Sequence, residues 1–150
     1  MAGDVLTDTC HGKKARYGLV GQFRQSLFGR LGSHDDVNDA GLMGDVNLSV
    51  YCASKGGIVN LTRAPALELA PDVRVNCVCP SFIDTDMGRD EIEKADDPAA
   101  AEQTLIDYSP MKRFATPEEI GRASAYLASD DARCVTGAAF RLDGGTTAGH

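Results

Sequence analysis

The sequence lacks the features that would place it in several broad classes of protein. It has no apolar run long enough to span a membrane, and residues 1–4 lack the basic and then apolar order of a signal peptide. It also lacks an excess of basic charge, since its formal net charge is −7. Nucleic acid and anionic membranes need a concentrated positive surface. We therefore expect a cytoplasmic protein that binds neither.

Metal-ligand and disulfide patterns are missing as well. The three histidines are scattered, and the five cysteines show no CxxC spacing. Neither a zinc site nor a disulfide framework is indicated, and we predict no metal. Cys77 and Cys79 would point to the same face of a strand, where buried free thiols are ordinary.

What remains is the profile of one globular domain, with 150 residues, 43% of them hydrophobic and 25% charged. Residues 1–16 are expected to be polar and irregular. Hydrophobic periodicity predicts helices over 19–31 and 49–70, a helix within 97–108 and one over about 117–128. Strands are predicted over 73–79 and 138–142, and the first reads as a parallel strand covered on both faces. Helices that alternate with strands indicate an α/β fold.

Two prolines have opposite effects on the predicted helices, since one favours the start of a helix and the other destabilises the interior of a helix. Thr116-Pro-Glu-Glu119 offers an N-cap hydroxyl, a proline at the first helical position and a glutamate that completes a capping box. Pro65 falls inside the helix predicted over 49–70, where it loses the hydrogen bond to Leu61 and costs about 3 kcal/mol.

The stretch Tyr51-Cys-Ala-Ser-Lys55 places a phenol and an ammonium one helical turn apart. A cation beside a phenol favours the phenolate, so Tyr51 is a candidate to exchange a proton with an alcohol or carbonyl. Tyr-x-x-x-Lys alone is a weak pattern, because any helix with an exposed tyrosine and lysine can show it. Small residues follow the pair, which suits a helix that a large group must approach closely.

Four blocks in order resemble the short-chain dehydrogenase/reductase family over roughly residues 40–148. The similarity implies a Rossmann-like, doubly wound parallel sheet, NAD or NADP as cofactor, an alcohol or carbonyl substrate, and assembly as a homo-oligomer. The acidic, alanine-rich segment 88–108 does not indicate a particular substrate. The blocks are Tyr51-Cys-Ala-Ser-Lys-Gly-Gly57, Arg74-Val-Asn-Cys-Val-Cys-Pro80 with Ile83-Asp-Thr-Asp-Met87, Thr116-Pro-Glu-Glu-Ile120, and Val135-Thr-Gly-Ala-Ala-Phe-Arg-Leu-Asp-Gly-Gly145.

The resemblance also implies roles for individual residues. Tyr51 would be the general acid/base, and Lys55 would favour its phenolate and hold the ribose hydroxyls of the nicotinamide. In the family the catalytic serine lies thirteen residues before the tyrosine and three before a glycine, and both rules point here to Asn38. An asparagine side chain can donate a hydrogen bond to a carbonyl oxygen, as the serine would. The remaining positions are Pro80, Ile83 and Thr85 around the nicotinamide, with Ser81 and Met87 at the substrate.

The amino-terminal half of the family is not matched. The glycine-rich strand–turn–helix that binds the cofactor diphosphate has no counterpart, because Gly18-Leu-Val-Gly21 and Gly41-Leu-Met-Gly44 lack its spacing. We therefore expect an incomplete Rossmann-like sheet. Residues 1–36 would be a divergent segment, and 37–150 the carboxy-terminal part of a single domain.

Three hypotheses follow from this mixture. The chain is a working NAD(P)-dependent oxidoreductase, an inactive carboxy-terminal remnant, or a non-catalytic protein that oligomerises through the helix that bears Tyr51. The family resemblance favours the oxidoreductase. The mechanism favours the inactive remnant for the chain as it stands, because the segment that binds the cofactor diphosphate in the family is not matched.

Overall fold

The computed structural model describes residues 7–8, 15–19 and 38–149, which form one sheet flanked by helices. In chain order the elements are β1 (Thr7–Asp8), β2 (Ala15–Leu19), η1 (Asn38–Gly41), α1 (Ser49–Glu68), β3 (Val73–Pro80), α2 (Asp86–Glu93), α3 (Pro98–Tyr108), α4 (Pro117–Ala128), η2 (Asp130–Ala132) and β4 (Ala139–Leu142).

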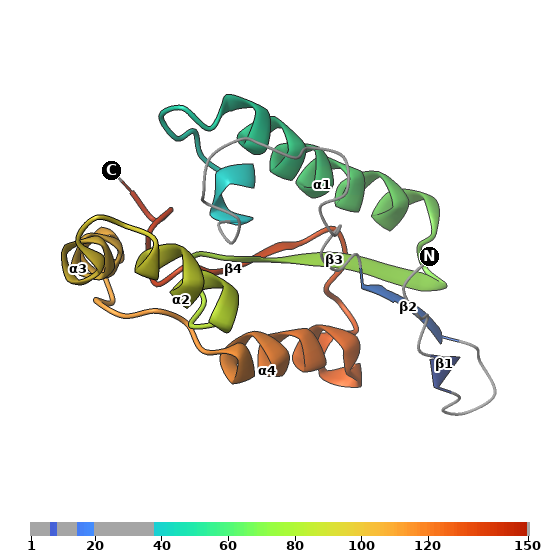
Figure 1. The fold of residues 1–150 in the computed structure, drawn as a ribbon. Helices are drawn as coiled ribbons and strands as arrows, with labels where there is room; N and C mark the ends of the chain where they lie inside the picture. Colours follow the sequence, from blue (N-terminus) through green and yellow to red (C-terminus); the bar gives the residue numbers. More distant parts are fainter. Residues whose placement is uncertain (1–6, 9–14, 20–37, 150) are drawn as a thin grey trace.

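The strands lie in the order β1-β2-β3-β4. β3 pairs in parallel with β2 on one side and with β4 on the other, and β1 pairs antiparallel with β2. α1 covers one face of this sheet and α4 the other, while α2 and α3 lie beyond the carboxyl end of β3 (Figure 1). The predicted α/β class is confirmed, and the described sheet is a partial version of the expected doubly wound arrangement.

β3 forms the centre of the core because helices cover both of its faces. Val75, Cys77 and Cys79 on this strand are buried. The Cys77 and Cys79 sulfur atoms lie 4.0 Å apart, and the two side chains cluster with Val59 of α1. The expectation that these cysteines are buried free thiols on one face is confirmed.

The predicted helices appear close to their expected positions. α1 ends at Glu68, α3 begins after its N-cap Asp97, and α4 carries the predicted capping box between Thr116 and Glu119. α1 continues through Pro65. One turn before the proline, the Thr62 hydroxyl donates a hydrogen bond to the Ile58 carbonyl oxygen at 2.9 Å.

Three elements differ from expectation. β1 and β2 lie in the region predicted to be irregular or helical. β2 is a strand because its backbone pairs with β3, although its own sequence carries little strand pattern. α2 was not predicted. It is short and polar, and it begins where the Thr85 hydroxyl accepts a hydrogen bond from the Gly88 amide. The rest of the helix predicted over 19–31 lies outside the described residues.

Among the helices that the structure describes, none combines the length and apolar character required to cross a membrane.

Candidate active site

The first two turns of α1 bring Tyr51 and Lys55 together. Because they are four residues apart on a helix, their side chains lie on the same face. The Lys55 Nζ atom lies 5.0 Å from the centroid of the Tyr51 ring, and both side chains are half-buried. A lysine ammonium at this distance from an aromatic ring is attracted to it. The structure therefore has the pairing that the sequence predicted, and the catalytic roles of the two residues stay predictions.

Gly41 allows η1 to approach α1 at this turn. A Cβ atom on Gly41 would lie 2.9 Å from the Lys55 carbonyl oxygen and 3.0 Å from a Val59 methyl carbon, so a larger residue would push η1 away. Asn38, the predicted serine-equivalent position, is the first residue of η1. Since η1 packs against both α1 and β3, it joins the helix that bears Tyr51 to the carboxyl end of the central strand.

The loop after β3 lies at the carboxyl end of the sheet, where α/β proteins bind ligands. Pro80, Ser81 and Ile83 are buried there. Ile83 forms a parallel bridge with Ala115, in which the Asp84 amide donates to the Ala115 carbonyl oxygen at 2.8 Å and the Ala115 amide donates to the Phe82 carbonyl oxygen at 3.0 Å. This pairing holds the loop in a defined position.

The other two predicted positions belong to α2 and its cap. The Thr85 hydroxyl accepts from the Gly88 amide at 3.3 Å, which leaves its own hydrogen able to donate. Met87, predicted to border the substrate, lies on α2 with 57% of its surface exposed.

These residues fit the nicotinamide end of a dinucleotide. Lys55 supplies a cation, Thr85 a hydroxyl with a hydrogen to donate, and Pro80 and Ile83 an apolar border. For the diphosphate, the described residues contain no glycine-rich turn between a strand and a helix. The fit therefore concerns one end of the cofactor.

Asp39, the second residue of η1, is a site feature that the sequence did not indicate. Its side chain is fully buried, and among the described residues neither carboxylate oxygen has a hydrogen-bond partner. Burial raises the pKa of Asp39 to about 6, and the nearby Ser81 hydroxyl offsets only part of that rise. In sequence, Asp39 belongs to a polar stretch with the ordinary signature of a solvated loop, so no signal marked it.

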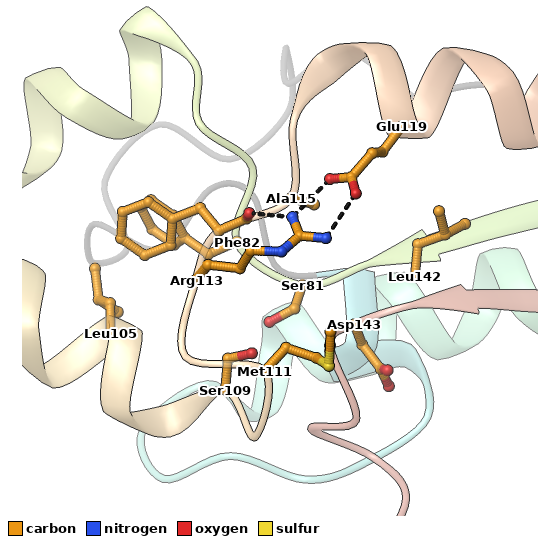
Figure 2. Close-up of a pocket in the computed structure, with 12 residues that line it drawn as sticks. Ser81, Phe82, Leu105, Ser109, Met111, Arg113, Ala115, Glu119, Leu142 and Asp143 are labelled. Atoms are coloured by element: carbon orange, nitrogen blue, oxygen red, sulfur yellow. Dashed lines mark hydrogen bonds and ion pairs between the residues drawn. The ribbon is translucent and has the colours of Figure 1, made fainter.

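A cavity of about 170 Å³ lies beside Ser81, and we call it the Ser81 cavity. Figure 2 shows Ser81, Ser109 and Asp143 at one side of it, with the Arg113–Glu119 pair at another. The cavity is lined by Ser81, Phe82, Leu105, Ser109, Met111, Arg113, Phe114, Ala115, Glu119, Leu142, Asp143 and Gly144.

The charged groups of the Ser81 cavity are already paired. Arg113 donates two hydrogen bonds to Glu119, at 2.6 and 2.8 Å, and this guanidinium holds the pKa of Glu119 at about 2. Burial raises the pKa of Asp143, but hydrogen bonds from Thr147 and Gly145 outweigh it, so the pKa is lowered. Both carboxylates therefore stay ionised at neutral pH.

The chain is similar to known proteins over most of its length. A family model described as "Enoyl-(Acyl carrier protein) reductase" matches residues 24–147. The chain is 47% identical over 111 residues to 2-(S)-hydroxypropyl-CoM dehydrogenase 3 of Xanthobacter autotrophicus, a match that covers 73% of this chain and 43% of that protein. It is 45% identical over 111 residues to a protein named inactive 2-(S)-hydroxypropyl-CoM dehydrogenase 2, covering 73% of this chain and 48% of the relative.

Among solved structures, 4-hydroxyisoleucine dehydrogenase complexed with NADH matches with a TM-score of 0.68 and 30% identity, over 76% of this chain and 46% of that one. The described part of the chain has a partial Rossmann-type α/β fold. The chain belongs to the short-chain dehydrogenase/reductase family. It spans about half the length of the curated relatives it matches.

Proposed function

We propose that this chain carries the proton-transfer half of an NAD(P)-dependent oxidoreductase that interconverts a secondary alcohol and a carbonyl. The observation behind the proposal is the Lys55 ammonium 5.0 Å from the Tyr51 ring, on a helix that packs against β3. Residues 37–150 would form the carboxy-terminal part of the family's single domain, preceded by a divergent segment over 1–36. The family resemblance supports homo-oligomeric assembly.

Tyr51 would hold a proton at its phenol oxygen and donate it to the substrate oxygen during reduction, or remove the alcohol proton in the opposite direction. Lys55 would favour the phenolate through its positive charge and bond the ribose hydroxyls. When bound, the nicotinamide would supply or accept the hydride. An Asn38 amide at the serine position would donate a hydrogen bond to the substrate oxygen.

The remaining positions shape the site. Pro80, Ile83 and Thr85 would border the nicotinamide and bond its carboxamide, and Ser81 and Met87 would border the substrate. NADH in the complex of 4-hydroxyisoleucine dehydrogenase supports a nicotinamide cofactor for this chain.

Replacement of Tyr51 tests the proposal. With NADH or NADPH and a panel of secondary alcohols and ketones, we expect Tyr51→Phe to lower turnover about 10²- to 10⁴-fold, since that is the usual contribution of a general acid/base. Cofactor affinity, measured by cofactor fluorescence, should be nearly unchanged. Tyr126→Phe removes the same hydroxyl from an exposed position on α4 and serves as the control. Equal losses in both variants, or persistent turnover without the Tyr51 hydroxyl, would refute the role of Tyr51.

An inactive remnant is the second candidate. Its support is that the chain spans less than half of its relatives' length and that one of those relatives is named inactive. It predicts no saturable change in cofactor fluorescence up to millimolar NADH or NADPH, together with weakly cooperative thermal unfolding. Saturable binding and a sharp transition would rule it out.

A further inference from the structure

The wall of the Ser81 cavity includes a buried hydroxyl, that of Ser109, which the proposed reaction does not use. Ser109 is 6% exposed, and among the described residues its hydroxyl oxygen has no hydrogen-bond partner. Ser81, 9% exposed, lines the same space. In Figure 2 the two hydroxyl oxygens are directed toward the same region. Buried hydroxyls are nearly always hydrogen-bonded in proteins, so an unpartnered one beside a cavity points to a missing partner.

The rest of the lining is apolar or already engaged. Phe82, Leu105, Met111 and Leu142 contribute hydrophobic surface. Each charged lining group has a partner, because Arg113 pairs with Glu119 and Asp143 accepts from Gly145 and Thr147. An ionic ligand would therefore find no unpaired opposite charge on this lining and would have to lose its hydration. The lining suits an uncharged molecule with one polar group.

The walls are fixed in place by backbone and side-chain bonds. The Met111 amide donates to the Gly144 carbonyl oxygen at 3.1 Å, and the Ala115 amide donates to the Phe82 carbonyl oxygen at 3.0 Å. Gly144 has φ +60°, and a Cβ atom there would lie 2.4 Å from the Ser109 hydroxyl oxygen. The glycine thus lets the turn after β4 pack directly against Ser109. A cavity fixed in this way is preformed, which lowers the cost of binding.

We propose that the Ser81 cavity binds a small uncharged molecule about the size of a six-membered ring, with a hydroxyl group that pairs with Ser109 and Ser81. A dry cavity of about 150 Å³ is large enough for benzene, so the volume here of about 170 Å³ is sufficient. Tyr51 and Lys55 are not among the lining residues. The proposal concerns binding alone and stands whether or not the chain turns over a substrate.

Phenol and benzene are matched probes, because they differ by one hydroxyl. Methyl NMR of the methionines reports binding, because Met111 belongs to the cavity lining and Met87, which is assigned to the substrate border on α2, does not. Both side chains are exposed, so a shift of Met87 would report binding at the substrate border instead. We expect phenol to shift the Met111 methyl signal saturably and to leave Met87 unchanged. One hydrogen bond is worth about 0.5–1.5 kcal/mol, so phenol should bind about two- to twelvefold more tightly than benzene.

Two variants distinguish the contribution of the Ser109 hydroxyl to binding from the contribution of the cavity volume. Ser109→Ala should bring the phenol-to-benzene ratio close to one and leave benzene binding intact, and Leu105→Trp should fill the cavity and abolish both. Ser54→Ala removes an exposed hydroxyl on α1 and should leave the ratio unchanged. No Met111 shift at millimolar phenol, equal affinities in the unmodified chain, or binding that survives Leu105→Trp would each overturn the proposal. Should Ser109→Ala not fold, the ratio in the unmodified chain and Leu105→Trp still decide.

Discussion

Asp39 is a carboxyl group that the fold removes from water without giving its oxygens a hydrogen-bond partner among the described residues. Desolvation disfavours the charged form, and the carboxylates of Asp143 and Asp45 add repulsion, so its pKa is raised to about 6. Folding therefore stabilises the protonated form of Asp39. Ionisation of this one residue opposes the native state at neutral pH.

The consequence for stability has a definite sign. The folded pKa of Asp39 is about 6 and the ordinary value is 3.8, so the folded chain holds the proton longer than the unfolded chain does. Its contribution to stability is present below pH 4, falls as the pH rises toward 6, and stays lost above that. We expect Asp39→Asn to raise the free energy of unfolding at pH 7.5 by up to about 3 kcal/mol relative to its effect at pH 4.

Urea unfolding of both chains at the two pH values measures this difference. Asp72→Asn makes the same substitution at an exposed position and is the matched control. If Asp39→Asn changed stability equally at pH 4 and pH 7.5, the native environment of Asp39 would not be the one described.

Among single residues, the sequence predicted which two side chains on one helix lie together, and it did not predict which polar side chains become buried. The four-residue separation of Tyr51 and Lys55 on a helix determines that they lie on one face, so their proximity was predictable. Asp39 and Ser109 become buried only through packing between segments far apart in the chain. The residues next to them in sequence do not indicate that burial.

Within α1, Pro65 interrupts the hydrogen bonding of a helix that nevertheless continues to Glu68. Proline has no amide hydrogen for the Leu61 carbonyl, so we expect Pro65→Ala to stabilise the chain by up to about 3 kcal/mol. Pro98→Ala is the control, because Pro98 occupies the first turn of α3, where its missing amide costs nothing. Thermal and urea unfolding measure both variants. No gain from Pro65→Ala would mean that local packing already compensates for the lost bond.

Elements with local signals were predictable, and those that depend on partners were not. The capping box of α4 is encoded within four residues, and the structure confirms both of its hydrogen bonds. β2 becomes a strand because β3 lies beside it, and α2 is a mostly polar helix of eight residues whose buried residues are Gly88 and Ile92. Neither pairing that depends on a partner strand nor two buried residues in two helical turns form a pattern long enough to predict an element.

Across the whole molecule, the described sheet is covered by α1 on one face and α4 on the other (Figure 1). The outward surface of α1 still carries large apolar side chains, with Val50 50% and Leu61 51% exposed. These two residues lie on the same side of the helix. Exposed apolar surface of this kind favours association between chains.

We therefore expect native mass spectrometry and sedimentation to find a dimer or larger species. Leu61→Glu should shift the distribution to the monomer, because it places a charge within the apolar surface of α1. Gln103→Glu adds the same charge to an exposed position on α3 and should leave the mass unchanged. A monomer in the unmodified chain at working concentration would contradict this expectation.

The α/β class and the order of the later elements were predictable from alternating patterns over long segments. The way that η1 joins α1 to the end of β3 was not, because it depends on Gly41 against the Lys55 carbonyl. A glycine in sequence does not reveal which backbone it will meet.

Glu119 connects two parts of the molecule through a single side chain. One of its oxygens accepts from the Thr116 amide at the start of α4, and the same carboxylate holds Arg113 at the edge of the Ser81 cavity. Its pKa of about 2 keeps it charged throughout the range in which Asp39 gains a proton. Acidification from pH 8 to pH 4 should thus protonate Asp39, while the Arg113–Glu119 pair stays ionised and keeps the cavity wall bonded to the start of α4. Over this range the stability of the fold changes with pH, and the charge of that wall does not.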